Sequence, residues 1–231
     1  MEDNFGNYFE IRDQPIFNKK IRYAKMRNFN DLNLNLGWDY HGKLNLELAD
    51  QLLKKYLIIK PNILKEVDDF ESKYFTNKTI LGVHYRGTDK KSEANQISYK
   101  KVEKNIELYL TKYPLTNYVF VSSDDNNFIN YIEKSAINCP IIYNNDSYRS
   151  SDDLPIHLAK NDLYEINKDA LINCLLLSRC TTLMKTASIL SDWSKLFNPK
   201  IQIILLSKPY ENFRYFPGKE YYDMVLYHAI D

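Results

Sequence analysis

The sequence predicts an α/β fold in which a doubly wound parallel sheet carries helices on both faces. Two observations indicate this fold class. Short apolar runs rich in β-branched residues alternate with segments of helical periodicity, and this alternation continues from about residue 60 to residue 208. The residues before it are too few for a second domain of equal size. We therefore expect an N-terminal segment, 1–59, and a Rossmann-like domain, 60–231.

The individual elements follow from the spacing of apolar residues and from the breakers between them. The run 79–85 is a short apolar stretch typical of a buried strand, and Pro61 suits the first turn of a helix. The predicted strands cover 79–85, 117–122, 140–143, 182–186 and 201–206. The predicted helices cover 45–57, 61–74, 99–112, 127–135, 169–178 and 191–198. Residues 1–45 are predicted to be irregular, and the polar stretch 144–167 is predicted to be a long loop.

Composition and charge exclude several classes of protein. Of the 231 residues 44% are hydrophobic, and the net charge of +1 provides no field that would attract nucleic acid or an anionic membrane. No apolar stretch is long enough to span a membrane, and the acidic N-terminus does not resemble a signal peptide. The unclustered Cys139, Cys174 and Cys180 are typical of buried free thiols in a reducing compartment. We expect a soluble, cytoplasmic protein.

A first polar cluster, His84-Tyr85-Arg86-Gly87-Thr88-Asp89-Lys90, follows the strand 79–85 at the edge where doubly wound sheets bind ligands. Strand alternation directs His84 and Arg86 to the same side. The guanidinium of Arg86 is a planar, permanently charged fork that suits a phosphate, and Gly87 permits close approach of the backbone. The alternative is a plain helix-entry loop in which Arg86 forms a salt bridge at the sheet edge.

Three further polar clusters are predicted at the same edge, outside the carboxyl ends of the strands. The carboxylates of Ser122-Ser123-Asp124-Asp125 could bind ribose hydroxyls or base nitrogens, or they could cap the next helix. Asn173 lies in an apolar helical run before Ser178-Arg179, and its buried amide needs partners, either a ligand or a neighbouring loop. Thr186-Ala187-Ser188 opens the last helix, where N–H groups and the helix dipole form an anion site or an ordinary N-cap.

The sequence lacks several motifs that would indicate other chemistry. It contains no GxGxxG, no GxxxxGK[ST], no HExxH and no GxSxG. Dinucleotide oxidoreductases, P-loop proteins, zinc hydrolases and α/β-hydrolases therefore lose their main support. The histidines His41, His157 and His228 are scattered, which favours surface or core positions over catalysis. We predict no metal ion and no cofactor.

The polar motifs resemble those of the α1,6-fucosyltransferases, a family that includes core fucosyltransferases and the rhizobial nodulation fucosyltransferase. Residues 84–90 resemble the HxRxTDK-type motif, 119–125 resemble the second motif, and 170–179 with 185–191 resemble the third. The motifs stand in the family order over about 60–200. The resemblance implies a GT-B architecture in which 60–231 bind the nucleotide-sugar donor and 1–59 are part or a remnant of the acceptor domain.

The resemblance also implies a reaction: inverting, metal-independent transfer of fucose from GDP-fucose to a hydroxyl of a glycan or glycolipid. Arg86 would bind the β-phosphate and stabilise the departing GDP, with His84 and Lys90 also in the donor site. Asp89 or Glu93 would act as general base. The remaining donor-binding residues implied by the motifs are Asp124, Asp125, Asn173, Thr186 and Ser188.

This sequence departs from the family pattern at two positions. Asn173 occupies a position that is often Asp, and Glu93 is displaced by one residue from the acidic residue that follows the first motif. Alternatives therefore stay open at this point. The same fold could use another nucleotide-sugar, it could be a catalytically inert module that binds nucleotide or glycan, or it could be a structural domain whose clusters are caps and salt bridges.

Overall fold

The computed structural model describes residues 8–11, 46–87, 95–150 and 163–207. Its centre is a five-stranded sheet in the order β5-β4-β3-β6-β7, with every neighbouring pair of strands parallel. The chain moves outward from β3 to β5, returns to the other side of β3, and moves outward again from β6 to β7. The sheet is thus doubly wound, and the predicted fold class is confirmed. The strands are β3 (Ile80–Tyr85), β4 (Tyr118–Ser123), β5 (Ile141–Ile142), β6 (Thr182–Lys185) and β7 (Gln202–Leu205).

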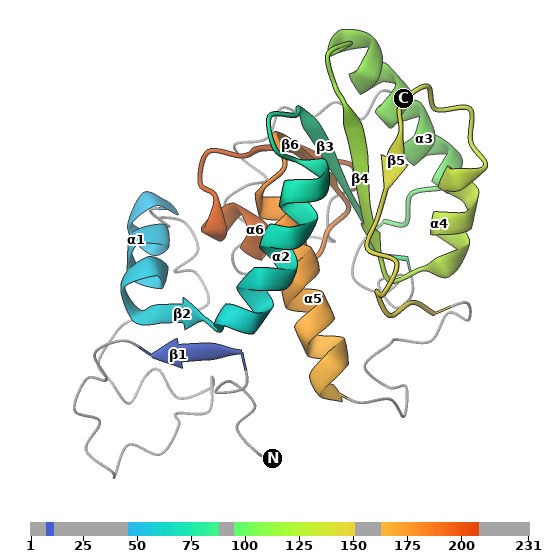
Figure 1. Ribbon diagram of the computed structural model, residues 1–231. Helices are drawn as coiled ribbons and strands as arrows, with labels where there is room; N and C mark the ends of the chain where they lie inside the picture. Colours follow the sequence, from blue (N-terminus) through green and yellow to red (C-terminus); the bar gives the residue numbers. More distant parts are fainter. Residues whose placement is uncertain (1–7, 12–45, 88–94, 151–162, 208–231) are drawn as a thin grey trace.

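Helices cover both faces of the sheet (Figure 1). One face carries α3 (Tyr99–Lys112) and α4 (Asn126–Glu133). The other face carries α2 (Pro61–Tyr74), α5 (Leu163–Ser178) and α6 (Ile189–Phe197). The α2 and α3 helices begin and end at the predicted residues. Pro61 stands in the first turn of α2, and the Ser98 hydroxyl caps α3 by accepting from the Lys101 N–H.

Two apolar cores flank the sheet because successive strand residues point to opposite faces. Leu81, Val83 and Tyr85 of β3 belong to the core beneath α3 and α4, whereas Ile80 belongs to the core beneath α2 and α5. Burying side chains of this size stabilises a fold by about 1.5–3 kcal/mol each. Gly82 lets the end of α5 and the turn after it approach closely, since a Cβ there would lie 2.8 Å from Cys180 Sγ and 3.4 Å from Leu177 Cδ2.

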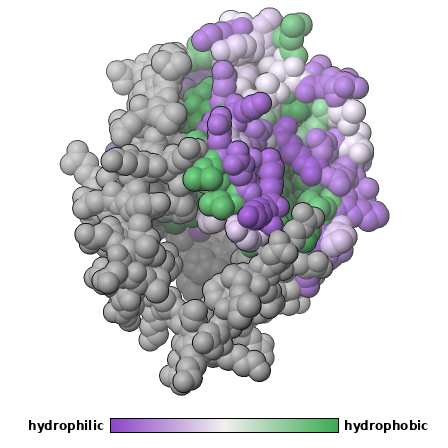
Figure 2. Space-filling model, turned by 90° about the vertical axis from the view of Figure 1, so that its left-hand side faces the viewer, coloured by the Kyte–Doolittle hydropathy of each residue, from purple (hydrophilic) through white to green (hydrophobic). Residues whose placement is uncertain are grey.

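The described part of the N-terminal region lies beside this domain. The strands β1 (Phe9–Ile11) and β2 (Leu57–Ile59) pair antiparallel, and α1 (Leu46–Tyr56) packs against α6. Two leucines of α1, Leu48 and Leu52, are about half exposed, at 51% and 47%. The described surface in Figure 2 is mostly hydrophilic, with small apolar areas between the polar ones.

Several predicted elements differ from the structure: α4 ends two residues earlier than predicted, at Glu133, and α6 begins two residues earlier, at Ile189. The long loop predicted over 144–167 ends earlier, because α5 begins at Leu163, and Ile166 lies buried one turn before the predicted start. The short strand β2 was missed, because three apolar residues after a helix show no period of their own, and Leu57 was assigned to that helix. The irregular structure predicted for 1–45 lies mostly outside the described residues, and within it Phe9–Ile11 form a strand.

Candidate functional site

The point where the strand order reverses lies between β3 and β6, the place where doubly wound sheets form a ligand crevice. His84 is paired in register with Lys185, so the two strands end together. Beyond them the Thr186 N–H donates to the His84 carbonyl at 3.0 Å, and the Arg86 N–H donates to the Thr186 hydroxyl at 2.9 Å. The structure therefore brings the first and fourth polar clusters side by side.

Arg86 is held in place by the second cluster. Its Nη1 lies 3.0 Å from Asp124 Oδ2, and the Gly87 N–H donates to Asp124 Oδ1 at 3.0 Å. Only glycine fits at position 87, since a Cβ there would lie 2.5 Å from Asp125 Oδ2. The Arg86 side chain remains 21% exposed, against 7% for Asp124. One buried carboxylate thus fixes both the backbone and the guanidinium of the loop after β3.

Asp125 caps the helix that follows β4. Its Oδ1 accepts from the N–H groups of Asn127 and Phe128 at 2.9 and 3.3 Å, and its Oδ2 accepts from the Tyr99 hydroxyl at 2.5 Å. Both carboxylate oxygens are therefore bonded within the protein. Of the two roles predicted for these carboxylates, Asp125 performs helix capping. Nucleoside binding by Asp124 and Asp125 stays a prediction.

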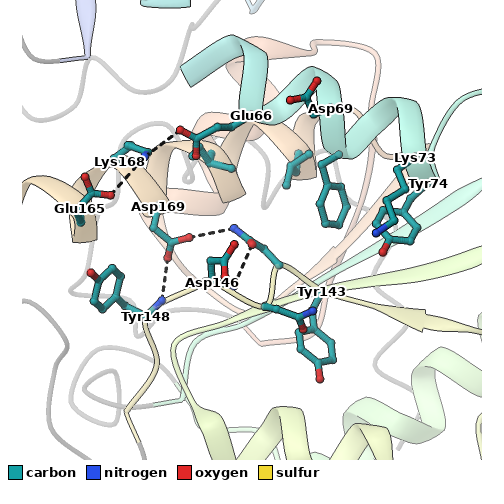
Figure 3. A pocket seen from close by; sticks show the side chains of 15 residues that line it. Glu66, Asp69, Lys73, Tyr74, Tyr143, Asp146, Tyr148, Glu165, Lys168 and Asp169 are labelled. Atoms are coloured by element: carbon teal, nitrogen blue, oxygen red, sulfur yellow. Dashed lines mark hydrogen bonds and ion pairs between the residues drawn. The ribbon is translucent and has the colours of Figure 1, made fainter. Parts of the chain in front are cut away.

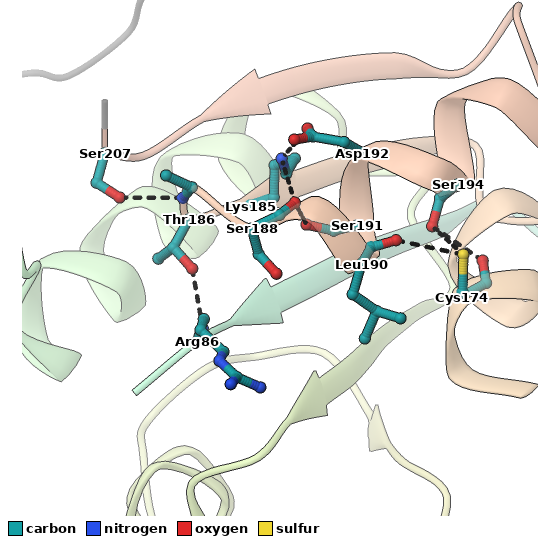
Figure 4. A network of polar contacts seen from close by, with 11 residues as sticks. Arg86, Cys174, Lys185, Thr186, Ser188, Leu190, Ser191, Asp192, Ser194 and Ser207 are labelled. Atoms are coloured by element: carbon teal, nitrogen blue, oxygen red, sulfur yellow. Dashed lines mark hydrogen bonds and ion pairs between the residues drawn. The ribbon is translucent and has the colours of Figure 1, made fainter. Parts of the chain in front are cut away.

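The turn between β6 and α6 presents a helix N-terminus to the same crevice. Ser188 occupies the N-cap position in an extended conformation, but its side chain makes no capping hydrogen bond. The Ala187 N–H donates to the Ser207 hydroxyl at 3.3 Å, which ties the turn to the end of β7. Figure 4 shows Thr186 bonded to Arg86 at the end of β3, with Ser188 further along the same turn. A helix N-terminus without a side-chain cap suits an anion.

His84 lies beneath this surface rather than on it. Its side chain is 3% exposed, and the Nδ1 atom has no hydrogen-bond partner among the described residues. Burial, followed by the positive charges of Lys185 and Arg86, lowers the pKa of His84 to about 3. The imidazole is therefore uncharged near neutral pH, and direct contact between His84 and a diphosphate stays a prediction.

Asn173 belongs to a different polar cluster. Its amide donates to the Ser147 hydroxyl at 2.9 Å and to Asp169 Oδ1 at 2.9 Å, and Asp169 also accepts from the Tyr148 N–H at 3.2 Å. These bonds tie the loop after β5 to α5. Burial raises the pKa of Asp169, which is partly opposed by these hydrogen bonds. Of the two kinds of partner predicted for the Asn173 amide, the structure shows the neighbouring loop. A role of Asn173 in donor binding stays a prediction.

The Asp169 cluster borders a pocket of about 420 Å³ between α2, α5 and the loop after β5 (Figure 3). Its charged lining consists of five carboxylates and two ammonium groups, supplied by Glu66, Asp69, Asp146, Glu165, Asp169, Lys73 and Lys168. Lys168 is paired with Glu66 at 2.9 Å and with Glu165 at 3.3 Å. The excess of negative charge disfavours a phosphate in this pocket.

The third polar cluster does not join the crevice, which corrects the prediction that it lies at a carboxyl strand end. Because α5 runs antiparallel to the strands, its last residue reaches the amino edge, where the Thr181 N–H donates to the Ile80 carbonyl. The Ser178 hydroxyl donates to the Leu175 carbonyl at 2.6 Å. Arg179 pairs with Asp68 at 2.7 Å and with Glu71.

Several predicted residues lie outside the described residues, namely Thr88, Asp89, Lys90, Glu93, His41, His157 and His228. The three cysteines are free thiols, as predicted, although Cys139 is only half-buried. Within 8–11, 46–87, 95–150 and 163–207, no cluster of three or more His, Cys, Asp or Glu side chains could hold a metal ion. None of the helices in these ranges combines the length and apolar character that crossing a membrane requires.

An ion pair beneath the crevice was not predicted from the sequence. Lys185 and Asp192 are in direct contact, with side chains 1% and 2% exposed. Tyr99, which bonds Asp125, and Ser207, which bonds the turn before α6, were missed as well. A lysine that ends an apolar strand was the available signal for the ion pair, because a buried ammonium requires a partner.

No family model and no curated protein matches the chain. Solved structures do match. The chain is similar to fucosyltransferases of known structure. The fucosyltransferase NodZ from Bradyrhizobium is 19% identical with a TM-score of 0.47, and the match covers 72% of this chain and 52% of that chain. A mutant of Arabidopsis thaliana FUT1 in complex with GDP is 13% identical with a TM-score of 0.46, covering 73% and 38%. POFUT1 in complex with GDP-fucose is 14% identical with a TM-score of 0.44, covering 69% and 49%. This chain thus spans about half or less of their length.

Proposed function

We propose that this chain is a glycosyltransferase that holds the diphosphate of a nucleotide-sugar in the crevice between β3 and β6. One arrangement carries the proposal. Arg86, fixed by Asp124 yet 21% exposed, lies beside the N-terminus of α6, which the Ser188 side chain does not cap. The guanidinium offers a cationic fork, and the helix offers N–H donors and partial positive charge. Together these groups suit an anion with two phosphates.

The motif resemblance supports GDP-fucose as the donor. Residues 84–90, 119–125 and 170–191 stand in the order of the α1,6-fucosyltransferase motifs. On this proposal 60–231 form the donor domain of a GT-B enzyme, and 1–59 contribute to the acceptor domain. The acceptor is a hydroxyl of a glycan or glycolipid. Asp124 acts by orienting Arg86, and Thr186 and Ser188 complete the phosphate site.

The proposed reaction is a direct displacement at the anomeric carbon. The acceptor oxygen forms a bond to that carbon from the face opposite the diphosphate, while the bond to the β-phosphate oxygen breaks, so the configuration inverts. The acceptor proton passes to Asp89 or Glu93. The electron pair leaves with the diphosphate, where Arg86, Lys90 and the α6 N-terminus stabilise the developing charge without a metal ion.

The proposal is tested by thermal unfolding of the wild type and of Arg86→Ala with GDP, GDP-fucose, UDP and ADP. A ligand at a hundred times its Kd stabilises the native state by about 2.7 kcal/mol. In a chain of this size that free energy raises Tm by several degrees, at roughly 2–4 °C per kcal/mol. We expect a rise with GDP and GDP-fucose that Arg86→Ala loses. Arg179→Ala is the matched control, since it removes a paired arginine from the opposite edge of the sheet, and we expect it to retain the shift.

The same panel separates the competing functions. A larger shift with UDP or ADP than with GDP would indicate another nucleotide-sugar. A guanine-specific shift without sugar transfer to any glycan acceptor would indicate an inert binding module. The absence of a shift with every nucleotide, in a protein that unfolds cooperatively, would reject the proposed site.

A further inference from the structure

A fully buried ion pair lies directly beneath the proposed phosphate site. Lys185 is the last residue of β6, and Asp192 stands in the first turn of α6. Their side chains are 1% and 2% exposed, and the ammonium contacts Asp192 Oδ1. The segment 186–188, which carries Thr186 and Ser188 into the crevice, connects the two elements.

The ammonium of Lys185 also contacts the segment itself. Lys185 Nζ donates to the Ser188 carbonyl at 3.3 Å (Figure 4). The Ser191 hydroxyl donates to the same carbonyl at 3.2 Å. Bonds from Lys185 therefore reach the N-cap residue and the first turn of α6 from the inner side, while Arg86 and Ser207 contact the segment from its flanks.

Burial excludes Lys185 as a direct ligand of the phosphates. With 1% of its side chain exposed and its charge balanced by Asp192, the ammonium does not reach the crevice surface. Lys185 can therefore influence an anion only through its field, which Asp192 offsets, or through the position of residues 186–188.

Stability alone gives a weak reason for this pair. A buried ion pair is often no more stabilising than an apolar pair of similar size, because both charges lose their hydration. The cost is visible here, since Asp192 Oδ2 and the neighbouring His84 Nδ1 are buried without partners among the described residues. Burial raises the pKa of Asp192 despite the adjacent ammonium. The presence of this buried ion pair, with two polar atoms left without partners, therefore calls for an explanation other than stability.

We infer that Lys185 and Asp192 are positioning residues that hold segment 186–188 and the first turn of α6 in the shape that receives the diphosphate. The inference rests on the proposed function, because it assigns these residues to the same site. It predicts that removing both charges together preserves the fold but impairs recognition of the phosphates. Recognition of the nucleoside should remain, since neither residue reaches the surface.

The test compares the wild type with Lys185→Met/Asp192→Leu by thermal unfolding and by calorimetric titration of GDP, inorganic pyrophosphate and guanosine. We expect a Tm within a few degrees of the wild type, because no unpaired charge is left in the interior. The affinity for GDP and pyrophosphate should fall at least tenfold, with guanosine affinity unchanged. Lys65→Met/Asp69→Leu removes an exposed pair of the same residue types on α2 and is the matched control, with no expected change.

Two results would overturn the inference: a folded double variant that binds all three ligands as the wild type does, or one that loses guanosine affinity along with the others. Should the variant not fold, Lys185→Met/Asp192→Asn preserves the size of the acidic side chain and carries the same expectations. Failure of the wild type to bind either GDP or pyrophosphate would reject the proposed function itself, and the inference with it.

Discussion

The two edges of the parallel sheet each carry an arginine paired with carboxylates, and the surroundings of the two pairs differ. At the carboxyl edge Asp124 is 7% exposed and binds both the Arg86 guanidinium and the Gly87 N–H. At the amino edge Arg179 pairs with Asp68 and Glu71, whose side chains are 59% and 39% exposed. A buried carboxylate such as Asp124 fixes the backbone of the loop that it binds, whereas a solvent-exposed ion pair such as Arg179–Asp68 contributes little to stability.

The helix end that lies near each arginine also differs between the two edges. Arg179 directly follows α5, so its positive charge lies at a helix C-terminus, where the dipole favours a cation. The Arg86 N–H donates to the hydroxyl of Thr186, three residues before α6 begins, so this arginine lies by a helix N-terminus, where the dipole favours an anion. At the carboxyl edge the Arg86 charge is paired with Asp124, and the helix N-terminus adds partial positive charge beside it. This contrast is the reason for proposing that Arg86, rather than Arg179, binds the ligand.

The largest expected effect separates the two pairs by stability. Asp124→Ala leaves the Arg86 charge and the Gly87 N–H without their buried acceptor, and we expect a loss of about 2 kcal/mol in the free energy of unfolding. Asp68→Ala removes an exposed partner and should cost at most about 0.5 kcal/mol. Urea unfolding of both variants measures the difference. Equal losses would contradict the distinction between the edges.

The second prediction concerns pH and the buried His84 at the carboxyl edge. Its pKa is about 3 in the folded chain, below the value of about 6.5 in the unfolded chain, so the unfolded state binds the extra proton between these values. Its contribution to stability is complete above pH 6.5 and declines as the pH falls. Between pH 7 and pH 5 this decline is about 2 kcal/mol. Unfolding curves at both pH values should show a smaller loss for His84→Gln, and an identical loss would contradict burial of an uncharged imidazole.

A third, smaller effect is expected at the Asp169 cluster, where the Asn173 amide donates to a largely buried carboxylate. Asn173→Asp would place a second carboxylate at the position now 2.9 Å from Asp169 Oδ1. Repulsion should raise the pKa of the pair and cost about 1 kcal/mol at pH 7. Since a raised folded pKa penalises the charged form, the cost should diminish as the pH falls toward 5. Asn173→Ala, measured in parallel, removes only one of the hydrogen bonds that lower the pKa of Asp169, so its recovery should be smaller.

The smallest stability effect is expected at the N-cap of α6. Replacing a serine that caps a helix costs about 1 kcal/mol, but the Ser188 side chain makes no capping bond. Ser188→Ala should therefore cost less than about 0.5 kcal/mol, whereas Asp125→Ala, which removes a bonded cap of α4, should cost about 1 kcal/mol or more. Thermal unfolding of the two variants compares them. A larger cost at Ser188 would show that this hydroxyl serves the fold rather than a ligand.

The fold could be predicted from the sequence because its main elements carry strong local signals. Helices α2 and α3 have apolar stripes with a proline or serine start, and β3 is an apolar run at the point where the period changes. The strand β2 and the first turns of α5 could not be predicted, because β2 is three residues long and the start of α5 lies in a polar sequence. Their formation depends on tertiary packing, such as the pairing of Leu57–Ile59 with β1.

The site was predictable in part for a different reason. Residues that follow strands, such as Arg86 and Thr186, are brought together by the topology, so their positions along the chain were sufficient. The contacts that join residues distant in sequence could not be predicted from the sequence. Examples are the bond from Tyr99 to Asp125 and the pairing of Arg179 with Asp68. The bond from Tyr99 depends on a tertiary contact between two elements. The place of Arg179 follows from the doubly wound topology, because a crossover helix runs antiparallel to the strands and ends at their amino edge.

The most direct test of the proposed diphosphate site is calorimetric titration of GDP into the wild type, Arg86→Lys and Arg179→Lys. Each substitution preserves a positive charge but removes the planar fork of the guanidinium. We expect Arg86→Lys to weaken GDP binding by about tenfold or more, equivalent to roughly 1.4 kcal/mol, while Arg179→Lys binds GDP as the wild type does. Equal binding by all three proteins, or no binding by the wild type, would contradict the assignment of the carboxyl edge as the diphosphate site.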